Sequence, residues 1–373
     1  MKIAIASDWF APRRGGIEGQ LLELAEQLGN RGHAVDVITS TPGASGGNAF
    51  RLRQLDVARI PVVHLAVSPK LIRSLRSELV AGYDVVHAHV SVVSPVGYVA
   101  AAIARSLDLP TVVTFHSVLR HKRHLLRMAN LLGGLAKSRV GWTAVSELVA
   151  AQVRDALAGA DVAVLPNGVD LSFWTPPPPP TPARGGRVTL VSTMRLHRKK
   201  RPRQLVRAFA QAAQRAQASA RLVIIGEGPE RSRLEGLARD VGVHVELPGW
   251  RDREQLKRLY AHADGFVLPS LREAFGIAAL EARAAGLPVI AMGASGSSEF
   301  LRHGHDALIC RDDEDLARQI GRFIEDASLR ATLARAPVAL DRYDWDAVIA
   351  AHETLYQRAM KRAVSPELAV ASA

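Results

Sequence analysis

The sequence predicts an α/β protein built from two doubly wound parallel sheets. Short apolar segments alternate with amphipathic helical segments through both halves of the chain, which is typical of βαβ units. A run of prolines near the midpoint separates the two halves. The chain has 373 residues, which is enough for two domains of ordinary size.

In the first half, helices such as residues 18–28 place Leu21, Leu24 and Leu28 on one face. Runs of apolar residues bounded by polar ones mark the strands between these helices. We expect strands at 2–7, 35–39, 85–89, 111–115, 142–145 and 163–166.

The proline run in Thr175–Gly186 is expected to be a stiff, extended spacer, and a surface loop is the alternative. Strands are expected again at 188–192, 221–226, 243–247, 265–269, 289–291 and 307–310, with helices at 202–217, 231–241 and 315–327. The expected organisation is an N-terminal domain (1–170), a linker (171–186), a C-terminal domain (187–343), a final helix (344–363) and a flexible tail (364–373). Two such domains would face each other across a cleft at the carboxyl ends of their strands.

Composition and charge limit the expected cellular setting and the expected kinds of ligand. The single cysteine, Cys310, excludes a disulfide framework and a cysteine-based zinc site, so a cytoplasmic setting is expected. The first eight residues fit a strand better than a signal peptide.

The net charge of +12 favours a phosphate-bearing ligand or an anionic membrane. Aromatic residues make up only 5% and no nucleic-acid motif is present, so nucleic acid is not expected as a partner. A solvated basic surface is the alternative.

Residues 273–281 place Glu273 and Glu281 eight residues apart, across an expected loop and helix start. At about 1.5 Å per residue the two positions would be about 12 Å apart, roughly the distance from the sugar to the ribose of a nucleotide-sugar. The free backbone N–H groups at the helix start between them would suit a diphosphate. A helix carrying two solvated glutamates is the alternative.

Two further loops could contact phosphate. Arg195 and Lys200 lie five residues apart in a segment with six basic groups, where a guanidinium fork and an ammonium point charge would both suit an anion. Gly15 and Gly16 precede the first helix, where paired glycines let the backbone approach a ligand closely. A solvated basic loop and an ordinary tight turn are the respective alternatives.

Other motifs are less specific. His116 ends an expected strand, where it could hydrogen-bond a sugar hydroxyl or a developing charge, or be purely structural. Gly226 and Gly228 form an incomplete dinucleotide fingerprint. The acidic triplets at 313–315 and 344–346 precede helices, so capping explains them better than metal binding, and no metal site is expected.

Taken together, these motifs resemble those of the retaining glycosyltransferases of family 4, which have the GT-B fold of two Rossmann-like domains. The resemblance extends from residues 7–18 to the final helix, and its most specific part is the Glu-x7-Glu segment at 273–281. Met194 and residues 294–299 depart from the family pattern in loops near the expected donor. The resemblance implies that Glu273 contacts the donor sugar, Glu281 the ribose, and Arg195, Lys200 and the backbone of Phe275, Gly276 and Ile277 the diphosphate, with Gly16 near the phosphates and His116 beside the transferred sugar. It also implies that the final helix at 344–363 crosses back to the N-terminal domain.

The resemblance also implies a reaction. A hexose would pass from a nucleotide-diphosphate sugar to a lipid, glycan or small-molecule acceptor, with retention and without metal or cofactor. An inactive sugar-nucleotide-binding subunit and an epimerase are the alternatives.

The first half is similar to the subclass acting on inositol phospholipids, through residues 7–10, 87–89 and 114–116. The basic stretch at 120–137 could lie on an anionic membrane, at the inner face of the plasma membrane, and core packing is the alternative. Its expected apolar face comprises Leu125, Met128, Leu132 and Leu135.

Overall fold

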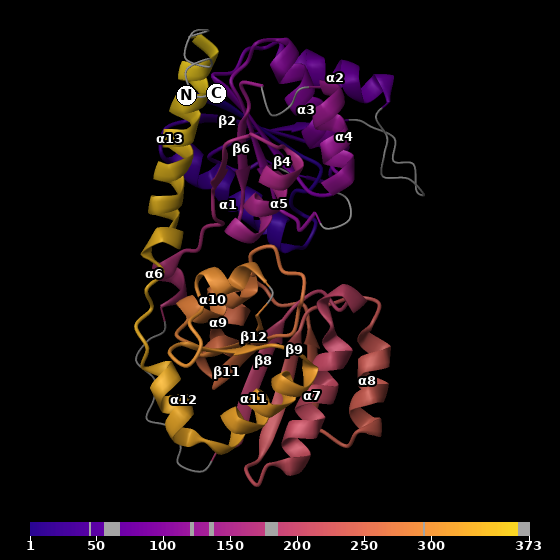
Figure 1. Ribbon diagram of the computed structural model, residues 1–373, viewed down its shortest axis with the longest axis vertical. Helices are drawn as coiled ribbons and strands as arrows, with labels where there is room; N and C mark the ends of the chain where they lie inside the picture. The colour runs from indigo at the N-terminus through magenta and orange to yellow at the C-terminus, as the bar shows by residue number, and fades with distance from the viewer. Residues whose placement is uncertain are drawn as a thin grey trace. The chain divides into compact units, whose positions relative to one another are not determined.

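The computed structural model describes residues 1–44, 46–55, 68–119, 123–133, 138–175, 186–293 and 295–364. The chain divides into two compact units (Figure 1). Unit 1 comprises Met1–Gly168 and the chain from Arg342 onward, and unit 2 comprises Val169–Asp341. Each unit contains one parallel sheet with helices on both faces, as the alternation of strands and helices predicts.

Unit 1 has a seven-stranded parallel sheet in the order β3-β2-β1-β4-β5-β6-β7. Six strands lie where apolar runs predict them, within two residues at each end. The short edge strand β3 is not predicted, because its sequence Arg-Leu-Arg-Gln contains one apolar residue and largely faces solvent. The strands are β1 (Lys2–Ser7), β2 (Ala34–Thr39), β3 (Arg51–Gln54), β4 (Val85–Val90), β5 (Thr111–Phe115), β6 (Gly141–Ala144) and β7 (Val162–Val164).

The two faces of this sheet bury different sets of side chains, because successive strand residues point to opposite sides. On β1, Ile3 and Ile5 join the core beneath α1 (Gly16–Asn30) and α13 (Trp345–Val364). Ala4 and Ala6 join the opposite core beneath α2 (Pro69–Leu79) and α3 (Pro95–Ser106). The remaining helices of unit 1 are α4 (Arg123–Gly133) and α5 (Glu147–Ala156).

Unit 2 has a six-stranded parallel sheet in the order β10-β9-β8-β11-β12-β13. The strands are β8 (Val188–Thr193), β9 (Ala220–Ile225), β10 (Val245–Gly249), β11 (Gly265–Leu268), β12 (Val289–Met292) and β13 (Ala307–Cys310). The helices are α6 (Leu171–Trp174), η3 (Arg198–Lys200), α7 (Pro202–Arg215), α8 (Arg231–Asp240), α9 (Arg253–Ala261), α10 (Ile277–Ala284), η4 (Gly296–Glu299), α11 (Asp313–Glu325) and α12 (Ala327–Ala334).

The boundary between the units differs from the predicted linker at 171–186. Residues 171–174 form α6, whose Trp174 is fully buried and stacks on Tyr260 with ring centroids 5.5 Å apart. Burial of this large aromatic makes α6 part of unit 2 rather than a spacer. The prolines at 176–180 lie outside the described residues, as does the predicted tail from residue 365 onward.

The C-terminal helix α13 belongs to unit 1 and packs against α1, β4 and β5. Helix η5 (Asp341–Tyr343) precedes it at the boundary between the units. In Figure 1, α13 is the long yellow helix. None of the helices in the described ranges is both long and apolar enough to span a membrane.

Candidate functional site

In unit 2, Lys200 and Glu273 form an ion pair. Lys200 ends η3 after strand β8, and Glu273 lies in the loop that follows β11, so neighbouring strands bring the two residues together. The Lys200 Nζ atom lies 2.8 Å from both carboxylate oxygens of Glu273. The side chains are 30% and 13% exposed, so the ion pair is partly accessible to solvent. Two residues predicted for different parts of one ligand are therefore in direct contact.

The loop after Glu273 leads into the N-terminus of α10 through Gly276. This glycine has φ of 98°, a left-handed conformation that residues with a Cβ rarely adopt. A Cβ there would also lie 3.0 Å from the Cβ of Ser297. The helix begins at Ile277, and its first backbone N–H groups have no partner within the helix. Glycine at this position therefore permits the tight entry into α10.

Phe275 anchors this loop rather than lining its surface. Its side chain is buried and packs on Phe300 with ring centroids 5.6 Å apart. Any contact of Phe275 with a ligand would accordingly come from its backbone, as the sequence predicts.

The loop around Gly296 packs against the loop that carries Glu273, and no sequence motif predicted this contact. Gly296 donates its N–H to the Glu273 carbonyl oxygen at 2.8 Å. A Cβ on Gly296 would lie 2.1 Å from the Ala274 carbonyl oxygen, so the two loops touch through backbone. Ser295 and Ser297 are buried beside it, with hydroxyl oxygens 2.7 Å apart. Residue 294 lies outside the described chain.

Arg195 is exposed in the loop that follows β8, and the Gly226–Gly228 loop holds that loop in place. Leu196 donates its backbone N–H to the Glu227 carbonyl oxygen at 2.8 Å. A Cβ on Gly226 would lie 1.9 Å from the Met194 carbonyl oxygen, and one on Gly228 2.4 Å from that of Leu196. Close packing of two loops thus accounts for the incomplete Gly-x-Gly motif without a ligand.

Glu281 lies about one turn into α10 and is half-buried. Burial, and secondarily the Glu281 charge, raise the pKa of Tyr260, whose hydroxyl is 2.9 Å from the Thr193 hydroxyl. The carboxylate of Glu281 therefore lies near the Tyr260–Thr193 hydrogen bond, which links α9 to β8.

In unit 1, Gly15 and Gly16 occupy the start of α1, as the glycine pair predicts. Glu18 lies over this start: a Cβ on Gly15 would be 2.2 Å from the Glu18 Oε2 atom. Glu18 is buried, and its carboxylate is 3.1 Å from the guanidinium of Arg13. The close approach of Glu18 is a structural reason for glycine at position 15.

His116 follows β5 and is paired with a second histidine, His89, near the end of β4. His116 Nε2 and His89 Nδ1 are 2.9 Å apart. Burial lowers the pKa of His116 to about 3, with His352 adding to the effect, and the residue as a whole is half-buried. Burial, and then the neighbouring His87, also hold the pKa of His89 well below its ordinary value. Both rings are therefore neutral at pH 7.

A chain of hydrogen bonds beneath this pair has a defined direction. The Thr143 hydroxyl donates to the Val113 carbonyl oxygen at 3.1 Å, so it must accept from the Thr114 hydroxyl at 2.5 Å. Thr114 must in turn accept from His87 Nε2 at 2.6 Å. Neutral His87 then accepts at Nδ1 from the Tyr356 hydroxyl at 2.8 Å. This chain ties helix α13 to strands β4, β5 and β6.

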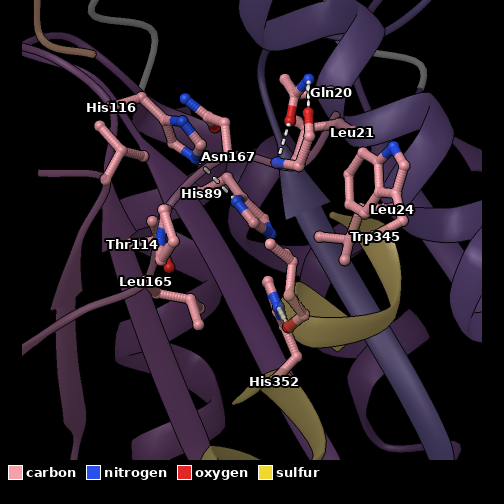
Figure 2. A pocket seen from close by; sticks show the side chains of 14 residues that line it. Gln20, Leu21, Leu24, His89, Thr114, His116, Leu165, Asn167, Trp345 and His352 are labelled. Carbon is pink, nitrogen blue, oxygen red and sulfur yellow. Dashed lines mark hydrogen bonds between the residues drawn. The ribbon is translucent and has the colours of Figure 1, made fainter. Parts of the chain in front are cut away.

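The histidines border a cavity of about 20 Å³ in unit 1 (Figure 2). That volume is about what one water molecule requires. In Figure 2 the His89 and His116 rings face each other across a dashed line, while His352 approaches from helix α13. The other polar side chains lining the cavity are Gln20, Thr114 and Asn167.

Two residues that the sequence did not single out fix the segment after β7. Gln20 donates its amide to the Gly168 carbonyl oxygen at 2.8 Å and accepts the Gly168 N–H at 2.9 Å. The Trp345 ring lies against Gly168, where a Cβ would be 2.5 Å from ring atoms. The Trp345 indole N–H donates to Glu23 at 2.6 Å. These contacts join positions far apart in sequence, so no local pattern could reveal them.

The predicted membrane stretch at 120–137 is described in part. Arg127 and Arg123 of α4 reach Asp155 of α5 at 2.5 and 3.4 Å. Met128 is 53% exposed. The side chains of the other three predicted apolar positions lie outside the described set.

The acidic triplet at 313–315 forms the first turn of α11 rather than preceding that helix, and the capping side chain belongs to the residue before the triplet. Asp312 caps α11 by accepting the Asp315 N–H at 2.8 Å. Within the described residues, no group of three or more His, Cys, Asp and Glu side chains could hold a metal ion.

Two family models match the chain. Residues 14–173 match the domain described as Glycosyltransferase Family 4, and residues 178–336 match that described as Glycosyl transferases group 1.

Relatives match over nearly the full length. A phosphatidyl-myo-inositol mannosyltransferase of Mycolicibacterium smegmatis is 29% identical, with 96% of this chain and 94% of the relative covered. A D-inositol 3-phosphate glycosyltransferase of Xylanimonas cellulosilytica is 28% identical, with 93% of each covered.

Solved structures share the fold. Anabaena HepE in complex with UDP and glucose has a TM-score of 0.72 at 20% identity, covering 98% of this chain and all (100%) of that one. Sucrose-phosphate synthase from Thermosynechococcus elongatus has a TM-score of 0.77 at 23% identity, covering 96% and 98%. The predicted GT-B fold is confirmed.

Proposed function

Since the chain belongs to the glycosyltransferases, with a family 4 domain followed by a group 1 domain, we propose that it transfers a hexose with retention from a nucleoside-diphosphate sugar to an inositol-bearing phosphate or phospholipid. Unit 2 would bind the donor and unit 1 the acceptor. The observation that carries the donor assignment is the Lys200–Glu273 pair at the N-terminus of α10.

This pair suits a ligand that has a sugar on one side and a diphosphate on the other. On binding, Lys200 would turn from Glu273 to the diphosphate, and the freed carboxylate would accept hydrogen bonds from sugar hydroxyls. The N–H groups of Gly276 and Ile277 and the guanidinium of Arg195 would add donors for the phosphates. Donor binding would break the ion pair between Lys200 and Glu273. The diphosphate would then replace Glu273 as the partner of Lys200, and the sugar hydroxyls would replace Lys200 as the partners of Glu273.

The reaction breaks the bond between the sugar's anomeric carbon and the diphosphate oxygen, and forms one from that carbon to an acceptor oxygen. The acceptor hydroxyl loses its proton to the departing diphosphate. Lys200 and Arg195 would stabilise the charge that develops on the leaving group, so this chemistry requires no metal. His116 would hydrogen-bond the transferred sugar, and Glu281 the ribose hydroxyls.

The acceptor class rests on the names of the relatives, which act on phosphatidyl-myo-inositol or D-inositol 3-phosphate. The net charge of +12 would favour such anionic acceptors. If the acceptor is a phospholipid, the exposed Met128 and the basic residues of α4 would contact the membrane surface. Flotation with anionic vesicles, comparing the protein with Met128→Asp, tests this contact. Equal flotation would overturn it.

The decisive experiment screens UDP-, GDP- and ADP-sugars by thermal shift, and then measures transfer to inositol phosphate and to phosphatidylinositol vesicles with and without EDTA. One donor should raise the melting temperature, because a ligand that binds only the native state stabilises it. Glu273→Ala should reduce kcat/KM about a thousandfold, since truncation removes sugar contacts and the partner of Lys200. Arg272→Ala, at the neighbouring position, is the control.

Each outcome bears on a different part of the proposal. Donor hydrolysis or isomerisation without transfer to any acceptor would exclude the transferase reaction. Normal turnover by Glu273→Ala would remove the donor-site assignment. Loss of activity in EDTA that is restored by a divalent cation would show that the reaction needs a metal.

A further inference from the structure

His89 has one ring nitrogen with a partner and one without. Its Nδ1 atom lies 2.9 Å from His116 Nε2, whereas its Nε2 atom is buried and has no hydrogen-bond partner among the described residues. The residue is 3% exposed, so bulk water does not reach that nitrogen. A buried polar atom without a partner is destabilising, because it has lost its hydrogen bonds to water and gained none. The surroundings of His89 should therefore supply one.

The cavity beside His89 can supply that partner. Its volume of about 20 Å³ is enough for a single water molecule, and His89, His116 and His352 all line it. A stable buried water needs two to four polar neighbours, and Thr114 and Asn167 add to those on the cavity wall.

The hydrogen bond of His352 determines which of its nitrogens can bind that water. His352 Nδ1 lies 2.7 Å from the Val348 carbonyl oxygen, which can only accept, so Nδ1 carries the hydrogen. Burial lowers the pKa of His352 to about 4, so the ring is neutral at pH 7 and Nε2 is an acceptor. A water that donates to His352 Nε2 keeps one hydrogen and a lone pair for His89 Nε2.

We propose that His89 is a positioning residue for His116, held in place by one water molecule that bridges His89 Nε2 to His352 Nε2 of helix α13. Only one hydrogen fits between His89 Nδ1 and His116 Nε2, so this bond couples the tautomer of His116 to that of His89. The tautomer of His89 thereby determines whether the other nitrogen of His116 donates or accepts. The catalytic part of this inference rests on the proposed role of His116 in glycosyl transfer.

The test reads the tautomer directly. Long-range ¹H–¹⁵N correlation spectra of protein labelled at histidine nitrogens distinguish the two neutral tautomers of each ring. In His89→Asn the amide reaches the position of Nδ1 and keeps a partner for His116, whereas in His89→Leu no polar group remains. We expect His116 to keep a single tautomer in His89→Asn and to show a mixture in His89→Leu.

The kinetic expectation is specific. His89→Leu should lower kcat on the order of tenfold to a hundredfold with little change in the donor KM, because misorientation of one group slows the chemical step more than binding. His89→Asn should restore most of that loss, and His352→Leu should reproduce part of it. Tyr356→Phe removes another hydrogen bond of the same helix and should leave the His116 tautomer unchanged.

An unchanged His116 tautomer in a folded His89→Leu protein would overturn the inference. A crystal structure with a dry cavity would overturn the water bridge to His352. If no donor and acceptor pair supports transfer, the spectra still decide whether His89 orients His116, so failure of the proposed function is distinguishable from failure of this inference.

Discussion

The two units share a parallel α/β architecture but place their titratable groups differently. Unit 1 buries neutral histidines, and the pKa values of His87, His89, His116 and His352 all lie below the ordinary value. Unit 2 holds ionised carboxylates against arginines. Burial would raise the pKa values of Glu230 and Asp315, but hydrogen bonds from arginines and backbone hold them below the ordinary values.

This difference predicts which unit responds to acid. In unit 1, neutral rings can form a hydrogen-bond chain with a defined direction, which protonation would interrupt. In unit 2, three arginines (Arg198, Arg203 and Arg233) surround the Glu230 carboxylate, and such ion pairs persist until the carboxylate is protonated. Similar folds can thus differ in stability against pH because of a few buried side chains.

Acidification should produce the largest contrast. Between pH 6.5 and the lowered folded-state pKa values, an unfolded chain binds protons at these histidines and the folded chain does not, so unit 1 loses stability as pH falls. Asp8 opposes this, because burial raises its pKa to about 6 and the folded state then binds the extra proton. With four histidines against one carboxyl group, going from pH 7 to pH 5 should destabilise unit 1 by several kcal/mol.

The pKa values of the unit 2 carboxylates Glu230 and Asp315 are lowered from ordinary values of 4.5 and 3.8, so their stabilisation begins to be lost only from about pH 5 downward. Unit 2 should therefore be nearly unaffected between pH 7 and pH 5. Urea unfolding at both pH values, followed by mass spectrometry of protease fragments, separates the units. Labelling of the buried thiol of Cys310 provides an independent probe of unit 2. Equal shifts in both units would contradict the comparison.

Gly276→Ala should have a smaller effect that is confined to unit 2. The substitution forces a left-handed φ on a residue with a Cβ and crowds Ser297, at a cost of about 1–2 kcal/mol. The donor affinity of unit 2 should fall as well, because the entry into α10 must shift. Donor titration measured by calorimetry checks the affinity. Gly236→Ala, on α8 with open space around its Cβ position, is the matched control and should retain donor affinity.

Tyr356→Phe should have the smallest effect, and it tests the hydrogen-bond chain of unit 1. The variant removes the only hydroxyl that donates to His87 Nδ1 among the described contacts, at a cost of about 1 kcal/mol. Burial is the main cause that holds the pKa of His87 well below its ordinary value, and this variant leaves the ring buried, so the loss should be similar at pH 7 and pH 5. Urea unfolding of this variant at both pH values measures the loss. A loss that shrinks at pH 5 would show that His87 takes up a proton, which would contradict its assigned neutral state.

Sequence reasoning recovered most of the fold because buried parallel strands are short, apolar and bounded by polar residues. It missed β3, whose exposed Arg-Leu-Arg-Gln sequence has no such pattern. It placed residues 171–174 in a linker because the following prolines dominate the local composition, whereas burial of Trp174 makes them a helix of unit 2.

Some residues of the candidate site could be predicted from local sequence motifs, and others could not. Glu273, Lys200 and His116 lie in the segments that follow strands, where a local motif and its position in an α/β unit are both visible. Gln20, Trp345 and Gly296 became evident only from contacts over long sequence separations. The Gly-x-Gly motif at 226–228 gave an ambiguous signal, because glycine is required equally by a ligand and by a neighbouring loop.

The sequence by itself determined the alternation of strands and helices, the two parallel sheets and the chemical types available at their strand ends, because periodicity and residue type are local properties. Only the tertiary structure decided that Lys200 pairs with Glu273 and that His89 pairs with His116. Those pairings depend on strand order and on packing between distant segments, which bring together side chains that no local pattern connects.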